Sequence, residues 1–354
     1  MVDTASPARP GDREALGFFA SLVFTAMAAV RDVYFAGVFQ EVSPLLVGVV
    51  AFSLCSIVFL PIALIRSPAS VGHLLRRPRE LVGVNMTTAL AWIAFFYALR
   101  TTEPLLVQVL FSGIGPLTIV CLDGHDRSRG ERVGHWGLMA TMALAAAVVL
   151  AGLSGGPPQP FGFALLGAVL ALFAGFSISV STLLSRRLND AGIDPTALVA
   201  LRFLGATLMA AALTLPAGQH LTALAPRGTI LGVTVASLLL MVVPIYVNQV
   251  GIALASPLTV RVALAVGPVL IFVLQLVEGR LSSSPYSLTC AVLYGVVAIT
   301  AAVLRRRAFS TIILPSEDRD VAQAVTQQVE AEHGGRSVHP ITHPPLGCRI
   351  WPVR

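Results

Sequence analysis

The chain has 354 residues, of which 55% are hydrophobic and 12% are charged, and its mean hydropathy is +0.81. Soluble domains carry about 25% charged residues, so a soluble fold of this length could not bury so much apolar surface. The net charge is +6 and all 24 basic residues are arginine. In a membrane protein such a balance indicates orientation and not nucleic-acid binding. The apolar runs are too long for barrel strands, and we predict an all-α integral membrane protein.

Apolar runs of about 20 residues, the length that crosses a bilayer, follow one another along the chain. We expect ten transmembrane helices, near 15–36, 43–65, 81–100, 104–122, 135–153, 161–184, 195–216, 229–254, 257–277 and 284–304. Residues 1–14 form an N-terminal tail, and residues 305–354 form a largely disordered C-terminal tail. Pro104 and Pro257 fit the first turn of the fourth and ninth helices, which tight hairpins join to the helices before them.

Arginines are distributed unequally between the two sides of the predicted bundle. With the N-terminus inside, 14 loop and flanking arginines fall on the inner side and three on the outer side. The inner set is Arg9, Arg13, Arg66, Arg76, Arg77, Arg79, Arg127, Arg129, Arg132, Arg186, Arg187, Arg305, Arg306 and Arg307, and the outer set is Arg100, Arg227 and Arg280. The bias predicts a multi-pass protein of the inner (plasma) membrane with both termini cytoplasmic, and it supports an even number of spans.

Two predicted helices share one design, a Gly-Pro pair in the middle of an apolar run. Gly115-Pro116 lies in the fourth helix and Gly267-Pro268 in the ninth, and Pro44 aligns with Pro195 at nearly the same offset. Residues 15–153 and 161–304 therefore read as two five-helix repeats. Because five is odd, the second repeat is inverted relative to the first, which is typical of secondary transporters.

Several segments in this order resemble the EamA family of the drug/metabolite transporter superfamily, over about residues 15–304. The segments are Phe96-Tyr-Ala-Leu-Arg-Thr-Thr102, the glycine- and alanine-rich opening at 161–176, Leu184-Ser-Arg-Arg-Leu188, Asp194-Pro-Thr-Ala-Leu-Val-Ala-Leu-Arg-Phe203 and Val277-Glu-Gly279. The resemblance implies ten helices around a central cavity. It also implies efflux of a small metabolite, such as an amino acid, an amino-acid-like compound or a drug-like compound.

Charged residues at membrane depth are expensive and indicate functional positions. Arg202 lies about eight residues, or roughly 12 Å, into its helix, and fits either a cavity contact or a structural anchor. Arg261 is nearer a helix end, and fits either snorkelling to the interface or a polar face turned to a pathway. Asp32 follows Arg31, and the two fit either a local ion pair or a gate and coupling site.

Further candidates combine apolar-aromatic walls with a few hydrogen-bonding groups, as in pockets for small organic molecules. They are Asn85 and Trp92 on the third helix and Tyr246 and Gln249 on the eighth. Gln108 lies on a polar, small face of the fourth helix with Gly115, and Phe272 lies on the related face of the ninth helix with Arg261. Trp92 fits ordinary packing equally well. Pro116 and Pro268 remove backbone hydrogen bonds inside their helices, and each fits either a hinge or a static kink.

The sequence predicts no catalytic residues, no cofactor and no metal site. Gly152-Leu-Ser-Gly-Gly156 lacks the strand that a nucleophile elbow requires, and His339, His343 and Cys348 lie in the unpatterned tail. A membrane-embedded enzyme acting on lipid-linked substrates would have to use the loop around His125 and Asp126. A non-transporting scaffold is the third alternative.

The expected partners are a small-molecule substrate and the lipid bilayer, with no nucleic acid. Gly228 and Gly232 form a GxxxG pair, which fits close helix packing better than the face of a homodimer. A homodimer stays an open alternative.

Overall fold

The computed structural model describes residues 10–123, 161–214, 227–264, 266–278 and 296. These residues belong to one compact unit, Met1–Leu304, whereas the second unit, Arg305–Arg354, lies outside them. The predicted spans 135–153 and 284–304, the loop around His125, the C-terminal tail and the GxSxG segment at 152–156 also lie outside the described residues. Within the described part the chain is helical and has no strands, which confirms the all-α prediction there.

The first half of the chain contributes five described helices. They are α1 (Pro10–Glu41), α2 (Pro44–Arg66), α3 (Pro68–Leu75), α4 (Pro78–Thr101) and α5 (Pro104–Asp123). The second half contributes α7 (Phe161–Asp190), α8 (Pro195–Arg202), α9 (Leu204–Thr214), α10 (Arg227–Ser237), the π-helical turn η2 (Leu238–Val242), α11 (Val243–Leu254), α12 (Pro257–Leu264) and α13 (Gly267–Val277). Seven of these helices begin at a proline, whose fixed φ suits the first helical position and whose missing N–H is not needed there.

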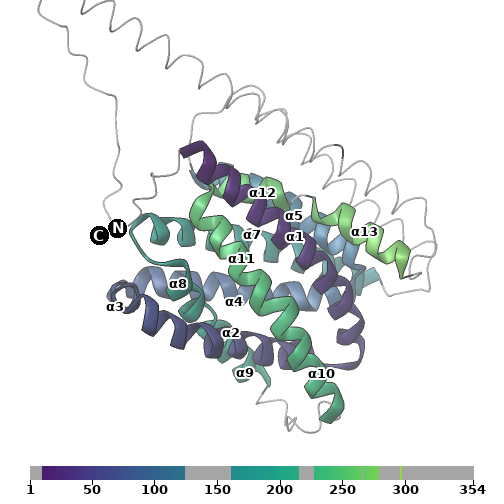
Figure 1. Ribbon diagram of the computed structural model, residues 1–354. Helices are drawn as coiled ribbons and strands as arrows, with labels where there is room; N and C mark the ends of the chain where they lie inside the picture. The colour runs from purple at the N-terminus through teal and green to yellow at the C-terminus, as the bar shows by residue number, and fades with distance from the viewer. Residues whose placement is uncertain (1–9, 124–160, 215–226, 265, 279–295, 297–354) are drawn as a thin grey trace, which may run out of the picture. The chain divides into compact units, whose positions relative to one another are not determined.

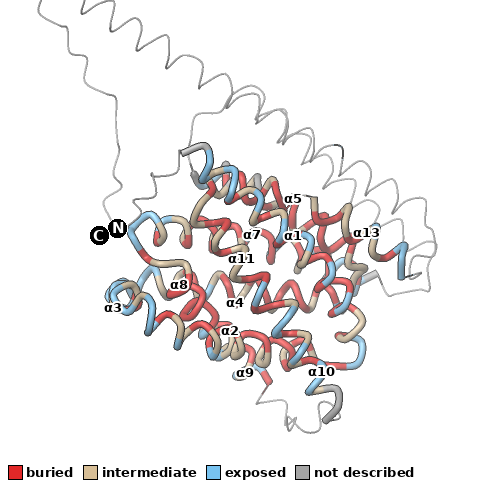
Figure 2. Tube along the Cα trace, in the orientation of Figure 1, coloured by how far each residue is buried: buried red, intermediate tan, exposed pale blue. Residues whose placement is uncertain are grey.

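Seven helical segments are long and apolar enough to cross a membrane, judged by length and composition. They are Asp12–Glu41, Pro44–Arg66, Pro78–Thr101, Gly162–Asp190, Pro195–Thr214, Ile230–Leu254 and Thr259–Val277. A shorter apolar helix, Pro104–Ile119, coincides with the fourth predicted span, 104–122. Buried and exposed stretches alternate along the helices in Figure 2, and the exposed faces carry large apolar side chains such as Phe19, Ile65 and Leu208. Such outward apolar faces are those of a multi-pass membrane protein.

Helices α1 and α7 extend beyond their predicted spans, and one short helix was not predicted. Helix α1 begins at Pro10, inside the predicted tail, because Asp12 suits its first turn and Glu14 finds a partner in α12. Helix α7 continues past residue 184 to Asp190, since Arg186 bonds to the end of α11. The short helix α3 was not predicted; it follows Pro68 between two spans.

The helices pack in pairs that join the two halves of the chain. Helix α1 lies against α11 and α4 lies against α7; α5 also lies against α7, while α12 and α13 lie against α1. Helix α2 contacts α8 and α9, and α5 contacts α12 and α13 (Figure 1). Each of these contacts joins segments that are far apart in the sequence.

Two tight hairpins, α4–α5 and α11–α12, are built alike. Each has one extended residue, Thr102 or Ala255, followed by one residue and the proline that starts the next helix. Ala255 packs against Gly17 of α1, where an added Cβ would lie 2.7 Å from Cβ of Ala255. Thr102 packs even more closely against Gly167 of α7. These glycines let the hairpins touch helix backbones.

The contacts of the two hairpins show that α1 and α7 run antiparallel. The α11–α12 hairpin meets Gly17, near the start of α1, and Arg186, near the end of α7. The α4–α5 hairpin meets Gly167, near the start of α7, and Gln40, near the end of α1, whose Nε2 donates to the Arg100 carbonyl at 3.4 Å. The start of each helix therefore lies level with the end of the other.

Helix interruptions are confined to the second half among the described spans. Phe203 separates α8 from α9, the π-helical turn η2 precedes α11, and a turn at Val266 precedes α13. Helices α2, α4 and α5 have no such break. The two Gly-Pro pairs therefore differ: Pro268 stands at the start of α13, after a break, whereas α5 continues through Pro116.

The glycine at the α4–α5 hairpin is open to a direct test. Gly167→Ala should lower the free energy of unfolding by about 1–3 kcal/mol, because the methyl group has no room beside Thr102. Gly162→Ala, in the same helix with nothing within 4 Å of the added atom, is the matched control and should leave stability unchanged or slightly raised. Thermal unfolding of the purified protein in detergent measures both. Equal effects of the two substitutions would contradict the close crossing.

Candidate functional site

A small cavity lies where helices of both halves meet. It is lined from α1, α4, α5, α7, α8, α11 and α12, and its volume is about 40 Å³. Its polar lining consists of Thr25, Arg31, Gln108, Thr182, Arg202, Asn248 and Arg261. Binding pockets for small molecules usually have about 300–1,000 Å³, whereas this space suits a few water molecules. The cavity is thus nearly closed in this conformation.

Two lining residues of the cavity, Gln108 and Arg261, take part in a reciprocal contact between α5 and α12–α13. A Cβ on Gly115 of α5 would lie 3.0 Å from Cδ of Arg261, and a Cβ on Gly267 would lie 2.8 Å from Nε2 of Gln108. Gln108 and Arg261 each stand four residues after a hairpin proline. Each of the two Gly-Pro pairs thus makes room for the polar side chain of the opposing helix.

Arg261 is only 1% exposed, so its side chain does not snorkel to the surface. Nη2 donates to Oγ1 of Thr182 at 2.8 Å. Nε and Nη1 have no hydrogen-bond partner among the described residues. Of the two alternatives for this arginine, the structure shows the polar face turned to a cavity.

Arg202 ends α8 immediately before the break at Phe203, and its guanidinium ties three other helices together. Nη1 donates to Oε1 of Gln249 at 2.7 Å, and Nη2 donates to the hydroxyls of Ser181 at 2.9 Å and Thr88 at 3.2 Å. All of these partners are neutral, and Nε has none in the described part of the chain. Arg202 therefore both anchors the helices and lines the cavity.

Arg31 and Asp32 form the local ion pair that the sequence left as one alternative. Nε of Arg31 and Oδ1 of Asp32 are 2.7 Å apart, and both residues are buried. The guanidinium also lies over the ring of Trp92, 4.8 Å from its centroid, in a cation–π contact. Arg31 thus lines the cavity, but the carboxylate of Asp32 balances its charge.

The structure brings four of the eight predicted substrate-binding candidates to the cavity: Trp92, Gln108, Arg202 and Arg261. The other four lie elsewhere. Gln249 stands behind Arg202 as its hydrogen-bond acceptor. Tyr246 stacks on Phe59 of α2, with ring centroids 5.1 Å apart, and Phe272 packs against the apolar core.

Asn85 has a structural position. Its Oδ1 accepts a 2.7 Å hydrogen bond from the backbone N–H of Gly205, and its Nδ2 donates to the Leu81 carbonyl at 2.9 Å. Gly205 follows the break between α8 and α9, where an N–H loses its partner within the helix. Asn85 therefore stabilises the interruption beside Arg202 and does not line the cavity.

Sequence reasoning missed the hydroxyl acceptors of α7 and the amide of α11. Ser181 and Thr182 bind Arg202 and Arg261 respectively, and Asn248 lines the cavity. A signal was present for α7, because residues 177–182 carry four hydroxyls in an otherwise apolar helix. Asn248 stands next to the predicted Gln249, and helical spacing alone does not show which of these two amides faces the cavity.

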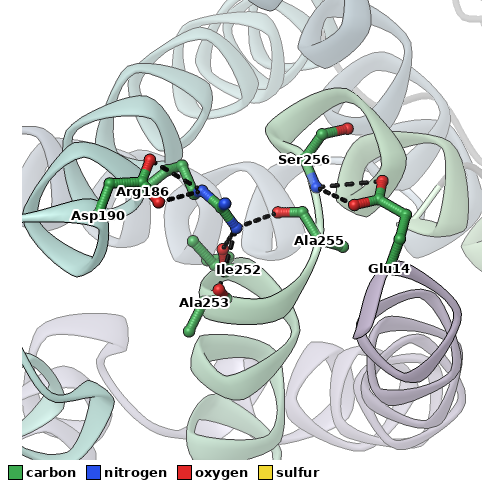
Figure 3. A network of polar contacts seen from close by, with 7 residues as sticks. All are labelled: Glu14, Arg186, Asp190, Ile252, Ala253, Ala255 and Ser256. Atoms are coloured by element: carbon green, nitrogen blue, oxygen red, sulfur yellow. Dashed lines mark hydrogen bonds and ion pairs between the residues drawn. The ribbon is translucent and has the colours of Figure 1, made fainter. Parts of the chain in front are cut away.

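A polar clamp holds the α11–α12 hairpin at one end of the bundle (Figure 3). Nη1 of Arg186 donates to the carbonyls of Ile252, Ala253 and Ala255 at 3.0–3.2 Å, which closes the end of α11. The carboxylate of Glu14 accepts from the N–H of Ser256 at 3.0 and 3.2 Å, at the start of α12. The cation at a helix end and the anion at a helix start both complement the helix dipoles.

The opposite hairpin, α4–α5, has no charged clamp of this kind among the described residues. It holds Glu103, whose Oε1 is buried without a hydrogen-bond partner in the described part of the chain. Burial raises the pKa of the Glu103 carboxyl, because the charged form is poorly solvated there. Within the described residues, charged side chains therefore hold the α11–α12 hairpin but not the α4–α5 hairpin.

Comparison with known proteins identifies the fold only. No family model and no curated protein matches the chain. Among the solved structures, 25 chains match. One, described only as a crystal structure of a protein, has a TM-score of 0.61 and 20% sequence identity over 84% of this chain and 99% of that chain.

The clamp predicts unequal effects at two adjacent arginines. Arg186→Ala should lower the free energy of unfolding by about 1–3 kcal/mol, because the carbonyls that end α11 lose a charged donor. Arg187→Ala is the matched control, since Arg187 is exposed, and its effect should stay within about 0.5 kcal/mol. Thermal unfolding in detergent distinguishes them. Similar losses at both positions would show that the clamp adds no stability.

The raised pKa of Glu103 predicts that its stability effect depends on pH. The folded protein holds this proton more tightly than the unfolded chain does. The ionised carboxyl therefore lowers the free energy of unfolding at pH values above its raised pKa. The effect disappears at pH values below the ordinary pKa of a glutamate. Glu103→Gln should therefore raise Tm near pH 8, with a gain that vanishes below about pH 4. Glu41→Gln, at an exposed glutamate, should show no such trend. A gain at Glu103 that is independent of pH would exclude the ionisation as its cause.

Proposed function

We propose that the protein is a secondary transporter that moves a small metabolite across the plasma membrane by alternating access, in the direction of export. One observation carries the proposal: a cavity lined by polar and cationic side chains lies between the two halves of an apolar helical bundle. Charged residues are costly inside a membrane, and in transporters they mark the substrate path. Substrate sites of such proteins lie near the middle of the bilayer, where internal repeats meet.

The pairing of the helices supports an inverted repeat. If the two halves are exchanged, α1 corresponds to α7, α2 to α8–α9, α4 to α11, and α5 to α12–α13. The α1–α11 pair then becomes the α7–α4 pair, and the α5–α7 pair becomes the pair of α12–α13 with α1. The pairs of α2 with α8–α9 and of α5 with α12–α13 stay unchanged. All of these pairs are in contact. Together with the antiparallel course of α1 and α7, this agrees with ten helices in two inverted halves, the fifth and tenth being the predicted spans 135–153 and 284–304. The arginine bias then favours cytoplasmic termini.

The size of the cavity supports a cycle of opening and closing. At about 40 Å³ it cannot admit a metabolite, so the bundle must open for a substrate to enter. The hairpins at the two ends are the natural gates, because each joins two helices that line the cavity. Arg186 and Glu14 hold the α11–α12 hairpin, whereas Oε1 of Glu103 in the α4–α5 hairpin has no hydrogen-bond partner among the described residues. This difference favours opening at the α4–α5 end from this conformation.

Alternating access is testable without knowing the substrate. In a variant whose native cysteines are replaced by serine, Ala28→Cys places a thiol in the cavity lining. A membrane-impermeant thiol reagent should label it both in whole cells and in inside-out vesicles. Ala171→Cys, fully buried in the apolar core outside the cavity, is the control and should not react from either side. Failure to label Ala28→Cys from both sides would contradict alternating access.

A further inference from the structure

The charges around the cavity do not balance within the described residues. Three guanidinium groups line it, those of Arg31, Arg202 and Arg261, and all three are at most 4% exposed. The buried carboxylate of Asp32 is bonded to Arg31. Arg202 and Arg261 bind only neutral oxygen acceptors and form no ion pair in the described part of the chain. Two positive charges are therefore left without a counter-ion.

Other carboxylates of the described helices are occupied elsewhere or lie at the ends of the bundle. Glu14 binds Ser256 and Thr259 at the start of α12. Glu103 belongs to the α4–α5 hairpin. A buried, unpaired cation is strongly unfavourable in a protein interior, and arginine does not escape the cost by losing its proton. The site therefore has a strong preference for an anion.

Arg202 and Arg261 also carry free donors. Nε and Nη1 of Arg261 and Nε of Arg202 have no hydrogen-bond partner among the described residues, although both side chains line the cavity. A guanidinium presents its N–H groups in a planar fork that fits the oxygens of a carboxylate or a phosphate group. Gly115 leaves space for the Arg261 side chain itself, because a Cβ at this position would lie 3.0 Å from Cδ and 3.6 Å from Nε of Arg261.

The rest of the lining is apolar and aromatic. Phe24, Trp92, Phe111 and Phe203 border the cavity beside the arginines. Phe24 and Trp92 lie against the guanidinium of Arg31, and Phe203 lies against that of Arg202. Phe111 adds apolar surface to the same lining. A bare inorganic ion would leave this surface unused when the cavity widens.

We infer that the transported substrate is a small organic anion, with one carboxylate or phosphate group bound between Arg202 and Arg261 and an apolar part against the aromatic side chains. This assignment rests on the proposed function and names the substrate class of the same site. Asp32 balances the charge of Arg31, whose guanidinium lies over Trp92. The assignment therefore places the acidic group at Arg202 and Arg261, although Nη1 of Arg31 also has no hydrogen-bond partner among the described residues.

The test is a charge series on the purified full-length protein, in detergent and in a zwitterionic buffer of low chloride content. The ligands are 3-phenylpropanoate, its neutral isostere 3-phenylpropanamide, phenyl phosphate, inorganic phosphate and chloride. Their effects on Tm are followed across a concentration range. One or both organic anions should raise Tm in a saturable manner, and the amide should bind at least tenfold more weakly. The tighter of the two organic anions identifies the preferred acidic group.

Substitutions locate the binding. Arg261→Gln should weaken the organic anions at least tenfold, whereas Arg261→Lys should recover part of the affinity and Arg187→Gln, at an exposed arginine, should change nothing. The charge series on the unmodified protein tests the assignment even where Arg261→Gln fails to fold. Equal stabilisation by the amide, stabilisation by chloride or inorganic phosphate alone, or unchanged binding in folded Arg261→Gln would each overturn the organic-anion assignment.

The result is separable from the transport proposal. Anion binding without labelling of Ala28→Cys from both sides would keep the anion site and reject alternating access. Two-sided labelling with no preference for anions would keep alternating access and reject the substrate class.

Discussion

The crossing of α5 with α12–α13 is the contact on which the centre of the bundle depends. Each of these helices offers a glycine at the crossing, and each glycine receives the polar side chain of the other helix: Gly115 receives Arg261, and Gly267 receives Gln108. Any larger residue would push these side chains aside or force the helices apart. Because the glycines keep the helices close, a guanidinium and an amide can lie between them in the interior. Their hydrogen-bonding groups then face a shared space instead of lipid.

Irregular helix geometry follows from the same need to place polar groups inside an apolar bundle. The break after Arg202 is stabilised by Asn85, which takes the backbone N–H of Gly205. Arg202 itself draws acceptors from α4, α7 and α11. Non-helical backbone is tolerated at membrane depth only where protein or water satisfies its polar groups. Among the described spans, helices α8–α9, α10–α11 and α12–α13 are interrupted whereas α2, α4 and α5 are continuous, so the two halves differ in helix geometry even though their pairing is symmetrical.

The sequence located part of the site because depth and helical periodicity are local properties. Gln108 and Arg261 were found from one polar, small face in each Gly-Pro helix, and Arg202 from its depth in an apolar run. On α11 the same reasoning selected Tyr246 and Gln249, but the structure turns Asn248 to the cavity. Periodicity shows which residues share a face, whereas the rotation of α11 about its axis is set by its packing against α1. That information is absent from the α11 segment itself.

The sequence by itself determined that the protein is a membrane protein and where its apolar segments lie. Among the described residues these are seven spans and one shorter apolar helix, with prolines at helix starts and two Gly-Pro helices. These follow from the hydropathy of each run and from the fixed φ of proline, which act within about 20 residues. Only the tertiary structure decided which cavity arginine has a counter-ion within the described part of the chain and which does not. It also decided that Asn85 supports a helix break and that Arg186 and Glu14 clamp one hairpin. Those outcomes depend on contacts such as Arg261 with Thr182 and Glu14 with Ser256, between helices that are distant in the chain, and no local pattern encodes them.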